Sequence, residues 1–417
     1  MQIKNNNEVK LYLDHICSKV KNKRIHKEIR EELLCHIEEM ALDFLECGIS
    51  EEESIKKSLS QMGSPNVVGE ELNTIHKEKI DLKLLIIVSL LISFGFLTLY
   101  SIELNFLIKT LMFTLLGVIT LVGTMFLDYR KLKNYSMHIY VITLILLVFS
   151  ALLYPPIGGK TGWLFLGPVT ISMPLISVFL FIISLSGLFN NIKSPIKRNL
   201  LSYMMLAIIP GIMLLITKSF LLFIIYSLAL CIIMKVNNIN VKYIISNSII
   251  NVFLFFTMGG YVKIIEQYTE ISGNPQIHDI IGSMLKSSVL FGKAKNFNPL
   301  IMPDVHTDFV FTYIIYNFGW IIGAVVIILF LALVVRMIKM ALNVKDSYGK
   351  TLIIGITSIF ALEAFFSILM NLNLIPTAYI SLPFISYSGS SSLISLLVIG
   401  IVINVYKGKT LPETSIV

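Results

Sequence analysis

Long apolar blocks alternate with short polar connections along most of this chain. Each block is close to the length of about 20 residues that a helix needs to cross a bilayer. The blocks cover residues 84–103, 105–127, 137–153, 169–189, 200–216, 220–236, 242–260, 309–335, 351–371 and 391–406. The pattern predicts an all-α fold. We expect a polytopic membrane protein with about ten transmembrane helices.

The first 80 residues follow a different pattern. Leu33, Ile37, Met40, Leu42 and Phe44 fall largely on one stripe at helical spacing, and glutamates surround that stripe. Such amphipathic spacing is typical of helices in a small soluble domain. We therefore expect residues 1–80 to form a small helical domain and residues 84–409 to form the membrane domain.

The charges are few and unevenly placed. Hydrophobic residues make up 55% of the chain and charged residues 14%, whereas soluble proteins carry about 25% charged residues. Basic side chains lie in alternate loops, as expected if these loops face the cytoplasm. They are Arg130, Lys131 and Lys133; Lys193, Lys197 and Arg198; Lys235 and Lys242; Arg336, Lys339, Lys345 and Lys350; and Lys407 and Lys409.

This charge distribution predicts that both termini are cytoplasmic and that the longest loop, residues 261–308, is extracytoplasmic. It also accounts for the formal net charge of +8 without a nucleic-acid partner. The cysteines, Cys17, Cys35, Cys47 and Cys231, contain no C-x-x-C pair. They predict neither a disulfide framework nor a zinc site, so no metal site is expected.

The long loop ends in the segment with the most unusual chemistry. His306, Thr307 and Asp308 lie directly before the apolar block 309–335. A carboxylate at the edge of a low-dielectric region can have a raised pKa and accept a proton from a hydroxyl group. Thr and Asp are also common caps at the start of a helix. The spacing alone favours capping and leaves the catalytic interpretation open.

Four segments carry distinctive motifs. The first motif, residues 303–311, is P-D-V-H-T-D-F-V-F, and the second, residues 382–391, is L-P-F-I-S-Y-S-G-S-S. The third, residues 162–168, is G-W-L-F-L-G-P, and the fourth, residues 290–293, is L-F-G-K. They resemble, respectively, P-E-x-H-T-D-F-I-F, L-P-F-I-S-Y-G-G-S-S, R-W-I-x-L-G-P and part of G-L-F-G-K-G of the SEDS family of FtsW, RodA and SpoVE, and they follow one another along the chain as in that family. Residues 1–80 resemble the helical prefix domain of many membrane permeases.

The resemblance implies a glycosyltransferase of the bacterial cytoplasmic membrane that polymerises lipid II into peptidoglycan during elongation, division or sporulation. It implies that Asp308 is the catalytic carboxylate, that the partner is a class B penicillin-binding protein, and that no organic cofactor is needed, with a divalent cation left open. The expected substrate-binding residues are His306, Thr307, Lys293, Lys295, Trp163, Lys160, Ser386, Tyr387, Ser390 and Ser391. Ordinary roles compete with these: snorkelling for each lysine, the aromatic belt for Trp163 and close helix packing for the serines.

The chain also departs from the family pattern. Gly162 stands in place of the family's Arg, Phe179 in place of a Lys, and Tyr316–Asn317 in place of an acidic pair. The lost charges keep two alternatives open. One is a catalytically inactive scaffold that binds lipid II or a penicillin-binding protein. The other is a flippase for lipid-linked precursors, with which the mid-block carboxylate of Glu363 is loosely consistent.

Overall fold

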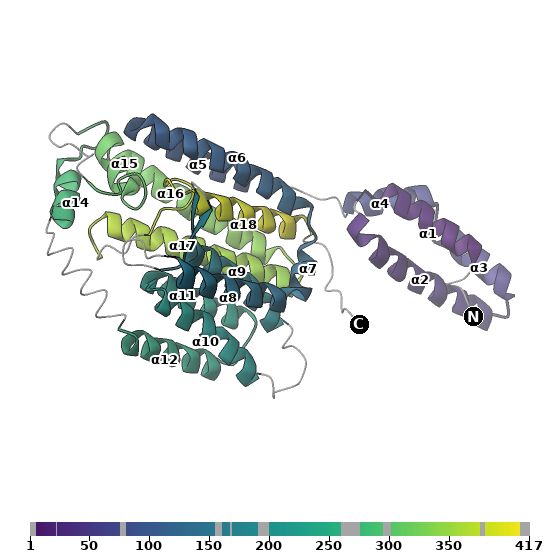
Figure 1. Ribbon diagram of the computed structural model, residues 1–417. Helices are drawn as coiled ribbons and strands as arrows, with labels where there is room; N and C mark the ends of the chain where they lie inside the picture. Colours follow the sequence, from purple (N-terminus) through teal and green to yellow (C-terminus); the bar gives the residue numbers. More distant parts are fainter. Residues whose placement is uncertain are drawn as a thin grey trace. The chain divides into compact units, whose positions relative to one another are not determined.

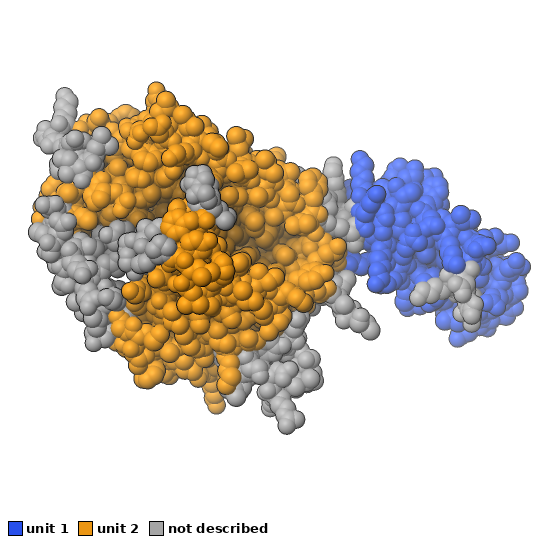
Figure 2. Space-filling view, viewed as in Figure 1, with its two compact units in different colours: residues 1–80, 410–412 blue, residues 81–409, 413–417 orange. Residues whose placement is uncertain are grey.

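The computed structural model describes residues 6–21, 23–75, 81–154, 161–166, 169–190, 200–259, 276–294, 302–375 and 380–408. Contacts divide the chain into two compact units, one within residues 1–80 and the other within residues 81–409 (Figure 2). Each unit has a hydrophobic core of its own.

The first unit is a bundle of short helices. They are α1 (Asn7–Lys19), the 3₁₀ turn η2 (Lys23–Ile25), α2 (His26–Glu46), α3 (Glu51–Gln61) and α4 (Pro65–Ile75). On α2 the buried positions recur every fourth residue and include Leu33 and Ile37, as the apolar stripe predicts. Leu42 departs from the predicted stripe, because it lies about 100° round the helix from buried Ala41 and is 52% exposed.

The second unit consists mostly of long apolar helices. They are α5 (Leu82–Ile102), α6 (Leu104–Phe126), the short α7 (Tyr129–Asn134), α8 (Ser136–Leu153), α9 (Met173–Asn190), α10 (Leu200–Ile216), α11 (Phe220–Val236), α12 (Val241–Thr257), α14 (Gln276–Ser287), α15 (Val310–Phe318), α16 (Trp320–Leu342), α17 (Ser347–Asn371) and α18 (Gly389–Lys407) (Figure 1). Within the described residues, 7 helices have the length and apolar composition to cross a membrane, and α10, α11 and α12 are shorter apolar helices. The prediction of a mostly helical polytopic membrane protein is confirmed.

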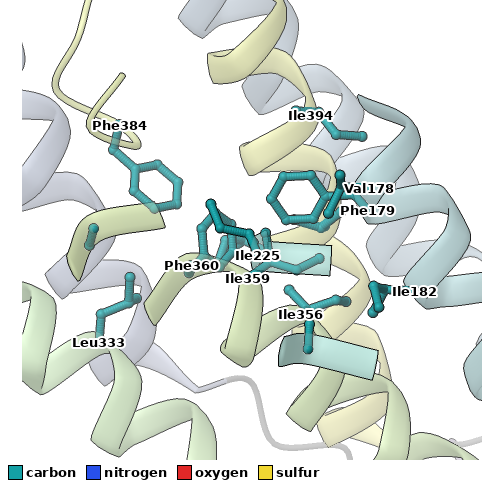
Figure 3. Close-up of a cluster of buried hydrophobic side chains, with 14 of the residues drawn as sticks. Val178, Phe179, Ile182, Ile225, Leu333, Ile356, Ile359, Phe360, Phe384 and Ile394 are labelled. Carbon is teal, nitrogen blue, oxygen red and sulfur yellow. The ribbon is translucent and has the colours of Figure 1, made fainter. Parts of the chain in front are cut away.

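Helices α9, α17 and α18 form the centre of this unit, and α6 packs along α18 (Figure 1). The peripheral helices α5, α6, α8 and α16 expose many Leu, Ile and Phe side chains, which suits lipid-facing surfaces. In the centre, the ring of Phe360 packs against Phe179 at 5.4 Å and against Phe384 at 5.2 Å between centroids (Figure 3). These rings join α17 to α9 and to the segment that precedes α18.

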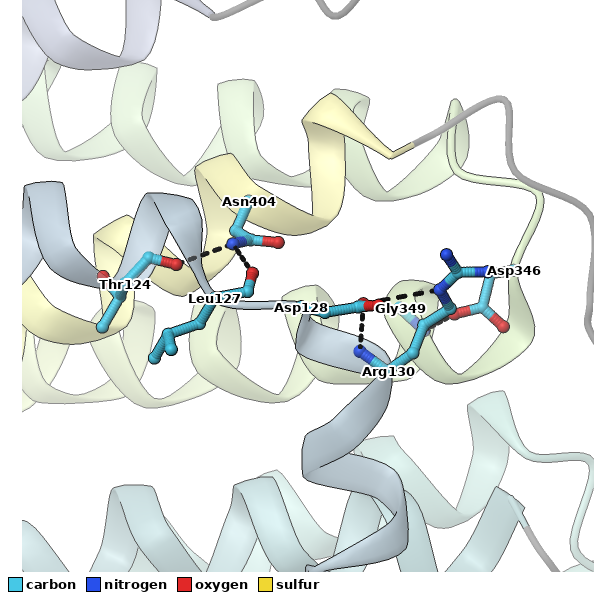
Figure 4. A network of polar contacts seen from close by, with 7 residues as sticks. All are labelled: Thr124, Leu127, Asp128, Arg130, Asp346, Gly349 and Asn404. Atoms are coloured by element: carbon cyan, nitrogen blue, oxygen red, sulfur yellow. Dashed lines mark hydrogen bonds and ion pairs between the residues drawn. The ribbon is translucent and has the colours of Figure 1, made fainter. Parts of the chain in front are cut away.

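Polar side chains fasten the ends of several helices. Asn404 of α18 donates hydrogen bonds to the carbonyl oxygens of Thr124 and Leu127, where α6 ends (Figure 4). At the start of α5, the buried Asp81 carboxylate pairs with Arg336 of α16. Burial alone would raise the pKa of Asp81, but hydrogen bonds from Arg336 and the Leu84 amide hold that pKa below its ordinary value. These contacts fix helices that lie far apart in the sequence.

Two of the predicted apolar blocks are not single helices. Block 169–189 begins with strand β2 (Val169–Ser172), which pairs antiparallel with β1 (Trp163–Leu166), so the prediction of an all-α fold missed a small hairpin. The prediction of one helix over 309–335 was wrong, because the chain breaks at Gly319 between α15 and α16. Gly319 has φ 95° and ψ 166°, a backbone conformation open almost only to glycine.

The segment 289–294 satisfies the backbone groups that this break exposes. The carbonyl oxygens of Val289 and Leu290 accept hydrogen bonds from the N–H groups of Trp320 and Ile321, both at 3.1 Å. In return, the N–H groups of Gly292 and Ala294 donate to carbonyl oxygens near the end of α15, also at 3.1 Å. Because an unpaired backbone group costs several kcal/mol in lipid, these four bonds make the break tolerable.

The same segment passes so close to Gly319 that no side chain fits there. A Cβ atom on Gly319 would lie 2.6 Å from the Leu290 carbonyl oxygen and 2.7 Å from the Phe291 Cα. We expect Gly319→Ala to lower the free energy of unfolding by more than about 3 kcal/mol, because backbone strain and a backbone clash add together. Thermal denaturation of the purified protein in detergent measures this loss.

Gly259→Ala is the matched control. Gly259 also has a positive φ of 72°, but a Cβ atom there meets no atom of the described residues within 4 Å. We expect this variant to lose only about 1–2 kcal/mol, the cost of the left-handed backbone. Equal losses at the two glycines would show that segment 289–294 does not pack tightly against the break.

Candidate active site

The His-Thr-Asp segment folds into a closed turn before α15. The carbonyl oxygen of Asp304 accepts hydrogen bonds from the N–H of Thr307 at 3.0 Å, the N–H of Phe309 at 3.2 Å and the Thr307 hydroxyl at 3.2 Å. Phe309 is the N-cap residue of α15. Neither Thr307 nor Asp308 therefore occupies the capping position, and the Thr307 hydroxyl closes the turn instead.

His306 connects this turn to two other parts of the unit. Its ring stacks on Phe106 of α6, with centroids 4.1 Å apart and planes 14° apart. The ring of Tyr387 lies 5.6 Å away, and the Tyr387 N–H donates to the His306 carbonyl oxygen at 2.8 Å. The first two motifs of the sequence thus meet directly.

Burial favours the neutral form of the His306 imidazole. Burial lowers the pKa of the imidazole below its ordinary value of 6.5, while the carboxylates of Asp304 and Glu103 partly oppose this shift. Asp308, beside it, is half-buried, and its carbonyl oxygen accepts a hydrogen bond from the Asn371 side chain at 2.9 Å. The arrangement places a carboxylate and a neutral imidazole at the entrance to α15.

The small residues of the second motif have structural contacts. The Ser386 hydroxyl oxygen accepts a hydrogen bond from the Leu382 N–H at 2.8 Å, and the Ser390 hydroxyl oxygen accepts one from the Ser172 N–H at 3.5 Å. Ser391 is buried in the first turn of α18. The serines thus have structural contacts, whereas the Tyr387 ring of the same motif lies beside His306.

Strand β1 carries Trp163, which is half-buried beside a small cavity of about 80 Å³. Hydroxyl groups predominate among its polar lining residues, which are Thr161, Ser172, Ser219 and Ser381. The hairpin is joined to the second motif through the bond between Ser172 and Ser390. The motif around Trp163 is therefore linked to the His-Thr-Asp motif through the segment at the start of α18.

The predicted cationic residues are only partly placed. Lys293 is exposed on segment 289–294, which packs against the break at Gly319. It lies between Gly292 and Ala294, whose N–H groups donate to carbonyl oxygens of α15. Lys160 and Lys295 lie outside the described residues. Within the described ranges, no group of three or more His, Cys, Asp or Glu side chains could hold a metal ion.

One of the lost family charges has an apolar replacement in the core. Phe179, which stands in place of a lysine, is 1% exposed and packs against Phe360. Glu363 is 2% exposed, and one of its carboxylate oxygens has no hydrogen-bond partner in the part of the chain that the structure describes.

The sequence did not predict Phe106 and Asn371 as neighbours of the His-Thr-Asp turn, because both contacts join residues far apart in the chain.

The lowered pKa of His306 predicts a pH dependence of stability. Because the unfolded chain takes up a proton near pH 6.5 that folded His306 resists, its contribution is complete above pH 6.5 and declines below it until the lower folded pKa is passed. His306→Phe keeps the ring stacking and removes the titration. We expect the thermal midpoint of the wild type to fall relative to that of His306→Phe between about pH 6.5 and 5. A constant difference over this range would contradict the burial of His306.

Comparisons with solved structures support the fold. The chain matches a subunit of a peptidoglycan synthase complex, solved in work on the coordination of polymerization and crosslinking, with a TM-score of 0.67 and 18% identity over 80% of this chain and 99% of that one. It also matches the rod shape determining protein RodA of Thermus thermophilus, with a TM-score of 0.64 and 19% identity over 79% of this chain and 98% of that one. At these identities the matches establish the architecture alone.

Sequence relatives extend the comparison. A probable peptidoglycan glycosyltransferase FtsW from Trichlorobacter lovleyi is 27% identical over 359 residues, which cover 79% of this chain and 93% of the relative. Stage V sporulation protein E of Bacillus subtilis is 38% identical over 104 residues, which cover 25% of this chain and 28% of the relative. The family model of the FtsW, RodA and SpoVE cell cycle proteins matches residues 77–411. The chain therefore belongs to the FtsW/RodA/SpoVE family of multi-pass membrane proteins.

Proposed function

We propose that this protein is a peptidoglycan glycosyltransferase that polymerises lipid II into β-1,4 glycan strands. The observation that carries the proposal is the His306–Asp308 turn. Asp308 is half-buried just before α15, outside the capping position, and Asn371 of α17 bonds its carbonyl oxygen. Contacts from α6 and from the segment before α18 hold His306 in the same turn. Family membership supports the same activity.

In the proposed reaction, Asp308 is the general base. Its carboxylate accepts the proton of the GlcNAc 4-hydroxyl group as that oxygen attacks the anomeric carbon of a MurNAc donor. The bond from this carbon to undecaprenyl pyrophosphate breaks, and the electron pair leaves with the pyrophosphate. A single displacement inverts the anomeric centre, so an α-linked donor gives a β-linked strand.

The pyrophosphate leaving group carries negative charge, which nearby cations stabilise. We assign this role to Lys293, with Lys160 and Lys295 as further candidates, and a divalent cation on the pyrophosphate is compatible with it. Trp163, His306, Thr307 and Tyr387 are proposed to contact the sugars. The hydroxyls of Ser386, Ser390 and Ser391 are proposed to shape the wall of the same site.

A second candidate, an inactive scaffold that binds lipid II or a class B penicillin-binding protein, is favoured by one observation. Phe179 fills with apolar packing the position of a family lysine. Both candidates share the partner, and polymerisation distinguishes them: a folded protein that binds lipid II without extending it is the scaffold.

We expect Asp308→Ala to reduce the rate of lipid II polymerisation by about 100- to 10,000-fold, the usual contribution of a general base. Gel analysis of glycan strands made by purified protein from labelled lipid II measures this rate. Asp304→Asn is the matched control, because Asp304 lies on the same turn, is exposed and supplies only its carbonyl oxygen to the hydrogen bonds there. Its rate is expected to stay within about threefold of wild type. Undiminished strand synthesis by Asp308→Ala would refute the catalytic assignment.

We further propose that both termini are cytoplasmic and that loop 261–308 faces the outside of the cell membrane. Cys35 and Cys47 are exposed on the first unit, whereas Cys17 is buried. A membrane-impermeant maleimide is therefore expected to label Cys35 and Cys47 only after cells are permeabilised. Pro303→Cys, introduced with Cys35→Ser and Cys47→Ser, is expected to be labelled in intact cells. Labelling of Cys35 in intact cells would contradict the proposed topology.

The first unit is proposed to be a cytoplasmic domain. Measuring polymerisation by a chain that lacks residues 1–80 tests whether this domain controls activity.

A further inference from the structure

The carboxamide of Asn371, at the end of α17, forms hydrogen bonds to the His-Thr-Asp turn, to the first turn of α15 and to its own helix. Its nitrogen donates to the Asp308 carbonyl oxygen at 2.9 Å and to the Ser367 carbonyl oxygen at 2.8 Å. Its oxygen accepts from the Thr312 N–H at 2.9 Å. The Thr312 hydroxyl, with its one hydrogen, lies 2.8 Å from the backbone carbonyl oxygen of Asn371 and 2.9 Å from the side-chain oxygen. Because two carbonyl oxygens need donors and one amide needs an acceptor, the orientation of the carboxamide is determined.

This side chain acts as a helix cap supplied by a neighbouring helix. The first N–H groups of a helix have no partner within the helix, and Phe309, the N-cap of α15, has no side-chain oxygen to offer them. Thr312 is the third residue of α15, and its N–H is paired by Asn371 instead. The α15 helix is thus fixed to α17 at its first turn.

The backbone around Asp308 is held on both sides. Its own carbonyl oxygen is bonded to Asn371, and the next N–H, that of Phe309, is bonded to the Asp304 carbonyl oxygen. The peptide plane between Asp308 and Phe309 cannot rotate without breaking one of these bonds. Asn371 and Thr312 are both 0% exposed, so water cannot replace the lost partner without opening the core.

We propose that Asn371 is a positioning residue for the proposed glycosyl transfer: it fixes the direction in which Asp308 presents its carboxylate, without touching substrate itself. The inference rests on the catalytic role proposed for Asp308. A displacement of about 1 Å in a catalytic group can cost about 100-fold in rate. Loss of Asn371 should therefore affect the chemical step much more than the binding of lipid II.

The test compares the steady-state kinetics of lipid II polymerisation by wild type and Asn371→Ala. We expect kcat to fall by about 100-fold while KM for lipid II stays within about threefold. Asn404→Ala is the matched control, since Asn404 is equally buried and also holds the end of a helix, but lies in the network around the last turn of α6. It should lose a similar amount of thermal stability and keep the kcat of wild type.

A conservative pair tests the same contact without removing the asparagine. Thr312→Ser keeps the hydroxyl that bonds to Asn371 and should keep the wild-type kcat, whereas Thr312→Val should lower kcat by about tenfold. This pair decides the question if Asn371→Ala does not fold. Equal kcat values for Thr312→Val and Thr312→Ser in that case would overturn the inference.

A double variant separates this inference from the proposed function. If Asn371 acts through Asp308, Asn371→Ala combined with Asp308→Ala should be no slower than Asp308→Ala alone. Multiplied losses in the double variant, or wild-type kcat in folded Asn371→Ala, would overturn the positioning role while Asp308 stays catalytic. Full activity of Asp308→Ala would instead refute the proposed function.

Discussion

Every backbone polar group inside a membrane domain needs a partner, and this requirement shapes the region around α15. The helix has only nine residues, so the unpaired groups at its two ends are close together. Asn371 of α17 pairs the amide of its first turn, and segment 289–294 pairs the carbonyl groups of its last turn. The helix is held by neighbours at both ends, and Asp308 lies just before its N-cap residue, Phe309.

The candidate site depends on this arrangement, because its parts come from distant points in the chain. Phe106 of α6, the His306 turn, Asn371 of α17 and Tyr387 before α18 are joined by ring stacking and by single hydrogen bonds. None of these contacts is strong alone. They act together because the central helices beneath them are packed through apolar contacts such as that of Phe179 with Phe360.

The sequence predicted the membrane helices well because hydrophobic length is a direct requirement of the bilayer. It could not predict the break at Gly319, since hydrophobicity continues across that residue and only the backbone angle changes. The hairpin at Trp163 was missed for a similar reason, as its second strand reads as the start of an apolar block.

For the candidate site, the motifs predicted roles for Asp308 and His306, but not the contacts that hold them. Asn371 looks like an isolated polar residue near the end of an apolar block, and no spacing rule connects it to Thr312. Only the packing of α15 against α17 brings the two together. Capping by Thr307 or Asp308, which spacing favoured, is replaced by a cap from another helix.

The clamp at Gly319 has a consequence for how this chain can change over evolution. Its bonds run from backbone to backbone, while the side chains of Leu290 and Phe291 are 73% and 72% exposed. Replacing either side chain by that of another non-proline residue leaves the four backbone bonds in place. Gly292, with φ 95°, and Gly319 have no such freedom, since both adopt backbone conformations that side chains rarely allow. The shape of this segment therefore depends on its two glycines more than on the side chains of Leu290 and Phe291.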